Sequence, residues 1–346
     1  MKTKWFKGLK IILPLFFGLY LMWYFYSSMS DDNKKYFFEA FKRCNYLWIV
    51  IGMALSIFAY FIRAWRWKLV LEPLGYTTSF WNRYHSLMIG YLINMTIPRA
   101  GEASRALMLY RSDKIPFASS FGTIIQERIV DLFMLSLLTG ASLVYSKETF
   151  ILLFQQIKQR FPKSNQESNF LVLSISIFLF FLLVFVGFYM LNKKYPDIKK
   201  KAIHTGKELI KGIFSLKNCS NIYFYILSTL SIWILYVVYF SIAFLCLPET
   251  QNISFEGILL AFILGAVGIS FTNGGIGAFP LLVGLVVTHF LKDKYDNAHA
   301  IGNAIGMIIW VSQTILLLIM GLISLILLPK KHKTEYDEST DKLIVE

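Results

Sequence analysis

The sequence predicts an all-α, polytopic membrane protein, and three observations carry that prediction. Of its 346 residues, 56% are hydrophobic. Several apolar runs reach the roughly 18 residues that cross a hydrocarbon core about 30 Å thick. Aromatic residues cluster at the ends of these runs, as at Trp65 and Trp67, which is typical of an interfacial belt. We therefore expect one integral membrane domain over residues 1–328 and a short, disordered cytoplasmic tail over 329–346.

The formal net charge of +14 favours a membrane surface over nucleic acid as the partner. The lysines and arginines lie mostly in connecting segments, as the positive-inside rule and attraction to anionic lipid headgroups require. The three cysteines, Cys44, Cys219 and Cys246, show no metal or redox spacing, so we interpret them as structural and expect neither a metal nor a cofactor. The lysine-rich N-terminus lacks a small-residue cleavage site, which favours an uncleaved first span.

Charge bookkeeping along the chain predicts six full spans and two hairpins. If residues 81–97 crossed the membrane once, the basic segment 192–220 would lie outside, against the positive-inside rule. If 81–110 instead enters from the cytoplasm and turns back, 192–220 and both termini lie inside. The turn would be Pro98–Gly101, because proline and glycine end helices. The full spans are expected at 9–26, 46–64, 118–145, 169–191, 221–247 and 299–328.

The same reasoning applies to the second apolar region, 255–291. This region must enter and return if the last span is to deliver the basic residues after Leu328 to the cytoplasm. Its turn would lie at Asn273, Gly274, Gly275 and Gly277, and two short complete spans are the alternative. Two interrupted hairpins that enter from opposite faces resemble an inverted repeat, which in transporters points to a site near the bilayer midplane. The residues expected to turn or gate these hairpins are Pro98, Gly101, Asn273, Gly274, Gly275 and Gly277.

Six charged residues in and beside these segments form the candidate site, since each costs about 2.5–3.5 kcal/mol when placed at the centre of a membrane helix. They are Arg99, Glu102 and Arg105 in the first hairpin, and Glu127, Arg128 and Asp131 in the next span. In a helix, Arg128 shares a face with Asp131, and so does Glu127. These two carboxylates and one guanidinium leave a surplus negative charge, which Arg99 or Arg105 could neutralise.

The cluster has two interpretations, which are compatible. One is a structural network of salt bridges that ties the hairpin to the span. The other is a polar cavity in which Arg99, Arg105 and Arg128 bind an anionic headgroup, since a guanidinium binds phosphate through two parallel hydrogen bonds. In that case Glu102, Glu127 and Asp131 would hold the arginines.

Other features have simpler readings. Residues 197–214 suggest an amphipathic helix on the inner surface, and Gly302 and Gly306 suggest a helix-packing contact. The glycine turn could be an anion nest of backbone N–H groups or only a tight turn. Asp31 and Asp32, in the first outer loop, are most simply a solvated turn, although membrane transferases that use polyprenyl-phosphate sugars carry acidic pairs in such loops.

Taken with the glycine turn, the motif Pro98–Glu102 with Arg105, followed by Gly122, Thr123, Glu127, Arg128 and Asp131, resembles the lysylphosphatidylglycerol synthase transmembrane-region family, also called flippase-like domain proteins. The resemblance covers about residues 10–328, and Asn273 stands where the family often has proline. It implies an integral membrane domain that moves a charged or lipid-linked headgroup between leaflets. Some members carry a fused aminoacyltransferase domain, and too few residues follow Leu328 for it, so we expect a stand-alone member.

The leading hypothesis is therefore a flippase of the plasma membrane that moves an anionic phospholipid or a polyprenyl-phosphate-linked headgroup and is not an enzyme. The alternatives are a polyprenyl-phosphate-dependent membrane transferase, or a non-catalytic lipid-binding partner of a separately encoded transferase. Membrane lipids are the expected partners in each case.

Overall fold

The apolar runs of the sequence fold into helices in the computed structural model of the chain, which describes residues 20, 23, 27, 30–97, 99–145, 147–149, 151–152, 155 and 196–328. No strand occurs among these residues, and the chain is an all-α polytopic membrane protein. The elements are α2 (Asp31–Arg43), α3 (Tyr46–Leu71), η1 (Glu72–Leu74), α4 (Phe80–Thr96), α5 (Gly101–Asp113), α6 (Phe117–Tyr145), α9 (Pro196–Ile213), η2 (Ser215–Asn218), α10 (Ile222–Ala243), η3 (Phe244–Cys246), α11 (Phe255–Phe271), η4 (Asn273–Gly275), α12 (Ala278–Leu291) and α13 (Ala298–Leu327).

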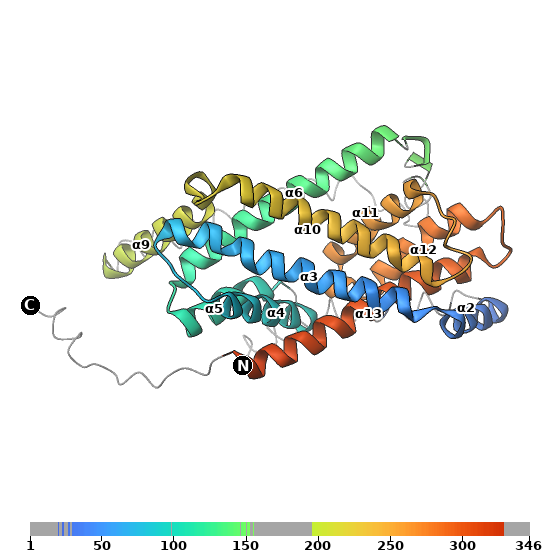
Figure 1. The fold of residues 1–346 in the computed structure, drawn as a ribbon, viewed down its shortest axis with the longest axis horizontal. Helices are drawn as coiled ribbons and strands as arrows, with labels where there is room; N and C mark the ends of the chain where they lie inside the picture. The colour runs from blue at the N-terminus through green and yellow to red at the C-terminus, as the bar shows by residue number, and fades with distance from the viewer. Residues whose placement is uncertain are drawn as a thin grey trace, which may run out of the picture.

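The longest helices run along the long axis of the molecule (Figure 1). Three stretches within the described residues are both long and apolar enough to cross a membrane: Tyr46–Leu74, Ile222–Cys246 and Ala298–Leu327. Helix α6, with 29 residues, has sufficient length but carries the charged residues of the candidate site. Four of the six predicted spans thus coincide with helices. The predicted span 169–191 lies outside the described residues, as does 9–26 apart from Tyr20 and Trp23, which are helical.

Both predicted hairpins are present as pairs of antiparallel helices. Helices α4 and α5 pack against each other at the end of the molecule that holds α9, whereas α11 and α12 pack at the opposite end, near α2 (Figure 1). At 1.5 Å per residue, these helices of 17, 13, 17 and 14 residues are about 26, 20, 26 and 21 Å long. Each is shorter than the hydrocarbon core of about 30 Å, which favours hairpins that turn back over complete short spans.

The two hairpins contact each other. The turn element η4 of the second hairpin contacts α4 of the first, and Trp310 of α13 donates a hydrogen bond from Nε1 to the carbonyl oxygen of Gly274 at 2.9 Å. Gly274, Gly275 and Gly277 all have positive φ, a conformation that glycine adopts without steric cost. The glycines predicted to form this turn therefore do so.

Close backbone approach at other glycines fixes neighbouring helices. Gly302 and Gly306 of α13 face the backbone of Gly284 and Pro280 in α12, so a side chain there would collide with main-chain atoms. This confirms the predicted packing role of the pair. Helix α9 packs on α6 in the same way, where Gly212 meets Gly122.

Candidate functional site

The charged cluster contains residues that the sequence did not predict, and one of them is Arg63 of α3. Its guanidinium forms ion pairs with Glu127 and Asp131 of α6, and its Nη1 donates to the hydroxyl of Tyr236 on α10 at 2.9 Å. The side chain of Arg63 is only 4% exposed. Neither Arg63 nor Arg66, which lies three residues later in the same helix, is among the site residues predicted from the sequence.

Glu127 is the centre of the cluster. Besides Arg63, it lies 3.6 Å from Nη2 of Arg66 and 2.9 Å from Nη1 of Arg105. Its side chain is 6% exposed, and Nη1 of Arg66 donates to the hydroxyl of Thr229 on α10 at 2.7 Å. A buried carboxylate is stable only when it is paired and hydrogen-bonded, and Glu127 has three guanidinium partners.

Arg105 of α5 is held between a charge and an aromatic face. Its guanidinium carbon lies 3.8 Å from the ring centroid of Trp67 on α3, a cation–π contact worth about 2 kcal/mol when desolvated. The Trp67 indole in turn donates to the hydroxyl of Thr123 at 2.8 Å. None of the three guanidinium nitrogens of Arg105 makes a hydrogen bond within the described residues, and the ion pair with Glu127 is their polar contact. The guanidinium N–H groups of Arg105 thus remain available as hydrogen-bond donors.

Arg128 is the partly exposed arginine of the cluster, whereas Arg99 makes no contact with the cluster among the ion pairs of the described residues. Arg128, whose side chain is 42% exposed, pairs with Glu102 of α5 at 3.1 Å and with Asp131 at 3.3 Å. Arg99 lies between α4 and α5, is exposed and has φ of 59°. It forms no ion pair with a carboxylate in the part of the chain that the structure describes, so none of the three predicted carboxylate partners holds it.

The charge balance of the site differs from that of the six predicted residues, whose three positive and three negative charges cancel. Four arginines from α3, α5 and α6 (Arg63, Arg66, Arg105 and Arg128) meet the three carboxylates of Glu102, Glu127 and Asp131. On α6 alone the surplus is negative, as expected, and Arg105 and Glu102 of α5, which cancel each other, leave it unchanged. The two arginines from α3 convert it to one surplus positive charge, which suits an anionic ligand.

The turn of the first hairpin was predicted at Pro98–Gly101, and the structure gives different outcomes for these two residues. Pro98 lies outside the described residues. Gly101 is the first residue of α5 rather than part of the turn, and its N–H donates to the side-chain oxygen of Asn94 at 2.7 Å. A side chain at Gly101 would collide with the carbonyl oxygen of Gly90 on α4. Gly101 therefore brings α5 against α4 and positions Arg105 one turn later. The side chain of Asn273, in η4, lies outside the described residues.

The acidic residues Asp31 and Asp32 lie in the first turn of helix α2. Asp31 pairs with Lys34 at 2.9 Å, with a side chain 99% exposed. The Lys34 ammonium lowers the pKa of Asp31 by hydrogen bonding and charge. The described residues hold no group of histidine, cysteine and carboxylate side chains suited to a metal. This arrangement fits a solvated helix N-terminus.

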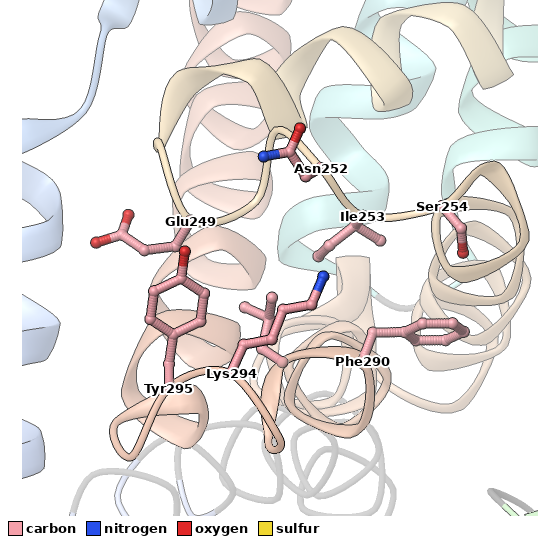
Figure 2. Close-up of a pocket in the computed structure, with 8 residues that line it drawn as sticks. Glu249, Asn252, Ile253, Ser254, Phe290, Lys294 and Tyr295 are labelled. Atoms are coloured by element: carbon pink, nitrogen blue, oxygen red, sulfur yellow. The ribbon is translucent and has the colours of Figure 1, made fainter.

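A cavity of about 180 Å³ lies at the α2 end of the molecule, away from the arginine cluster. Figure 2 shows its lining from two loops, with Glu249, Asn252 and Ser254 on one side and Lys294 and Tyr295 on the other. Glu249 is engaged by Arg43 at 2.6 Å. The cavity lies near the start of α3, whereas the cluster involves its second half.

Residues 11–316 match the protein family described as the lysylphosphatidylglycerol synthase TM region. The chain belongs to this family. The match includes the whole arginine cluster and both hairpins, so the membership expected from the sequence motifs is confirmed.

A UPF0104 membrane protein of Methanocaldococcus jannaschii is 32% identical to this member of the family over 87 residues. The matched segment covers 24% of this chain and 26% of that relative, so the chain spans about a quarter of its length. No solved structure matches.

Proposed function

We propose that this protein moves an anionic lipid headgroup, of a phospholipid or a polyprenyl phosphate, across the plasma membrane with both of its termini in the cytoplasm. The observation that carries the proposal is the cluster of four arginines, three of them buried, against three carboxylates, with its surplus positive charge. Such a cluster is costly in a membrane protein unless it serves a ligand or a polar pathway. Membership of the family supports the proposal.

The exposure of the arginines gives the order in which a phosphate would meet them. Arg99 is exposed and unpaired within the described chain, and Arg128 is partly exposed. These two guanidiniums would attract the headgroup from the membrane surface, and Arg128 would exchange Glu102 for the phosphate. Arg105 is more deeply buried and would meet the phosphate next, because its guanidinium N–H groups are free to donate to a phosphate oxygen. Guanidinium groups suit this role because they bind phosphate in a bidentate way.

The carboxylates would keep the arginines in place between transport cycles. Glu127 and Asp131 hold Arg63 and Arg105 from α6, while Glu102 moves with α5. The hairpins, which contact each other, would provide the alternating access, with Gly274, Gly275 and Gly277 as the flexible positions.

The test is a transbilayer assay in proteoliposomes that contain fluorescent phosphatidylglycerol, with the outer leaflet quenched chemically. Arg99→Ala and Arg128→Ala should each slow lipid movement by at least about tenfold, because a lost charge-assisted contact is worth roughly 1.5–3 kcal/mol. Arg111→Ala is the matched control, since Arg111 is an exposed arginine at the end of the same helix as Arg105. If both cluster variants fold and transport as well as the parent, the site assignment is wrong.

A further variant distinguishes the transferase alternative. Asp31→Asn removes the exposed carboxylate of α2 and leaves the arginine cluster untouched. We expect unchanged lipid movement. Loss of a polyprenyl-phosphate-dependent transfer activity in Asp31→Asn, with the arginine variants unaffected, would instead favour an enzyme that acts through the outer loop.

A further inference from the structure

Cys44 and Cys246 lie side by side although they are distant in the sequence. Cys44 connects α2 to α3, and Cys246 ends the turn η3 that follows α10. The N–H of Asn45 donates to the carbonyl oxygen of Cys246 at 2.8 Å. Both cysteines are buried, with 7% and 1% exposure, and the neighbouring Cys246 thiol lowers the pKa of the Cys44 thiol.

An ion pair fixes the same junction from the other side. Arg43 pairs with Glu249 at 2.6 Å, so the residues that flank the thiols in both segments are bonded across the contact. We call Arg43, Cys44, Asn45, Cys246 and Glu249 the outer clasp. A backbone hydrogen bond and an ion pair therefore hold the two segments of the outer clasp together. A disulfide requires neighbouring cysteine Cβ atoms, and the backbone hydrogen bond from Asn45 brings the residue next to Cys44 against the main chain of Cys246.

The outer clasp lies at the end of the molecule opposite the basic helix α9 (Figure 1). Helix α3 has 26 residues and is about 39 Å long at 1.5 Å per residue. Cys44 lies just before its first residue. At its other end, Leu69 accepts a hydrogen bond from Ser220, the neighbour of Cys219, at 3.3 Å. The positive-inside rule places the α9 end in the cytoplasm, so the outer clasp faces the extracytoplasmic side, where disulfides persist.

We propose that Cys44 and Cys246 form a disulfide bond on the extracytoplasmic face, made by exchange with a disulfide-donating oxidase of the cell envelope. The thiolate of one cysteine attacks the donor disulfide and forms a mixed disulfide, releasing one donor thiolate. The second cysteine thiolate then attacks the sulfur of the first, which releases the other donor thiolate. The chain loses two protons and two electrons, and the donor leaves as a dithiol. Cys219, at the cytoplasmic end, stays reduced.

The bond would act as a covalent brace between two parts of the chain. It ties the start of α3 to the end of α10, and these helices pack along each other over most of their length. It also fixes the wall of the cavity in Figure 2, because Glu249 belongs to both the outer clasp and the cavity lining. The brace is independent of the proposed lipid transport, since the arginine cluster lies in the other half of α3.

Differential alkylation tests the bond on the full chain. Protein is extracted from native membranes into denaturant with excess N-ethylmaleimide, then reduced and labelled with a heavier maleimide before peptide mass spectrometry. We expect Cys219 to carry the first reagent, and Cys44 and Cys246 to carry only the second. A linked peptide pair should appear when the reduction is omitted. If Cys44 and Cys246 both carry the first reagent, the proposal is overturned.

A thermal unfolding experiment gives an independent readout. Reductant should lower the Tm of the wild type by several degrees, because the bond closes a long loop in the unfolded chain. The double variant Cys44→Ser/Cys246→Ser should have the lower Tm with or without reductant, and Cys219→Ser should respond as the wild type does. A wild-type Tm that reductant leaves unchanged would contradict the brace.

Discussion

Nη1 of Arg105 lies 2.9 Å from Oε2 of Glu127, and both side chains are buried. The contact joins the first hairpin to α6, and Arg63 and Arg66 join α3 to the same carboxylate. A single glutamate thus holds three elements together within the membrane. A buried ion pair of this kind adds little net stability, but the removal of one partner leaves the other charges uncompensated.

Glu127→Gln should destabilise the protein by about 3–5 kcal/mol, since it leaves the guanidiniums around it without a charge partner in a dry environment. The measurement is the free energy of unfolding in detergent or, where unfolding is irreversible, the Tm. Asp293→Asn is the matched control, because Asp293 is exposed in the loop between α12 and α13, and we expect it to change stability by less than about 0.5 kcal/mol. Equal stability of the two variants would contradict the central role of Glu127.

Arg105→Lys should keep the charge but lose lipid-headgroup affinity. The lysine ammonium is a point charge that neither stacks on Trp67 as a planar group nor binds phosphate in a bidentate way. We expect at least about a tenfold weaker binding of phosphatidylglycerol vesicles, which corresponds to roughly 1.4 kcal/mol. The quenching of Trp67 fluorescence on vesicle addition should weaken in parallel, with Arg111→Lys as the control. Unchanged affinity would show that charge alone, and not the guanidinium plane, serves the site.

Much of the fold could be predicted because its determinants are local and periodic. The lengths of the apolar runs predict α3, α10 and α13, and the glycines at 274, 275 and 277 predict the second turn. The charge asymmetry of the loops predicts that the hairpins turn back. The apolar runs and the glycine turn are signals within one segment, whereas the charge asymmetry is a comparison of the loops along the chain.

The candidate site was predicted only in part, because five of its six ion pairs join different helices. Spacing along one helix shows that Arg128 and Asp131 share a face, and the structure confirms that contact at 3.3 Å. No local signal distinguishes Arg63 and Arg66 from basic residues that mark the cytoplasmic end of a span. The burial of Arg63 and Arg66 in the cluster results from the packing of α3 beside α6, which the sequence does not show. The one available signal was that Arg63 lies inside an apolar run rather than after it.

Gly101→Ala should displace the first hairpin. An added Cβ would lie 2.6 Å from Nδ2 of Asn94, besides its collision with Gly90, so α5 must shift and the hydrogen bond from Gly101 to Asn94 weakens. We expect a loss of about 1–3 kcal/mol in stability from overpacking, together with reduced lipid binding as Arg105 moves.

Gly140→Ala is the control for this prediction, because nothing lies within 4 Å of the position of its Cβ in α6. It should leave lipid binding unchanged and raise stability slightly, by up to about 1 kcal/mol, since alanine favours a helix. If the two alanine variants behave alike, the close contact of α4 and α5 does not position Arg105.

The attachment of α9 should depend on pH through Glu208. The Ser119 hydroxyl donates to this carboxylate at 2.7 Å, and Lys211 pairs with it at 3.0 Å. The hydrogen bond from Ser119 is the largest of the causes that lower the pKa of Glu208 below its ordinary value, and the hydrogen bond from Lys211 is the next. A carboxyl group with a lowered pKa in the folded state stabilises the fold above its unfolded pKa, about 4.3, and this contribution is lost as the pH falls through the folded value. Hydrogen exchange of the α9 amides should therefore rise below about pH 4, once corrected for the intrinsic rate.

In Glu208→Gln the protection should be weaker at neutral pH and should not change over the same range. A pH-dependent loss of equal size in Glu208→Gln would assign the effect to another group.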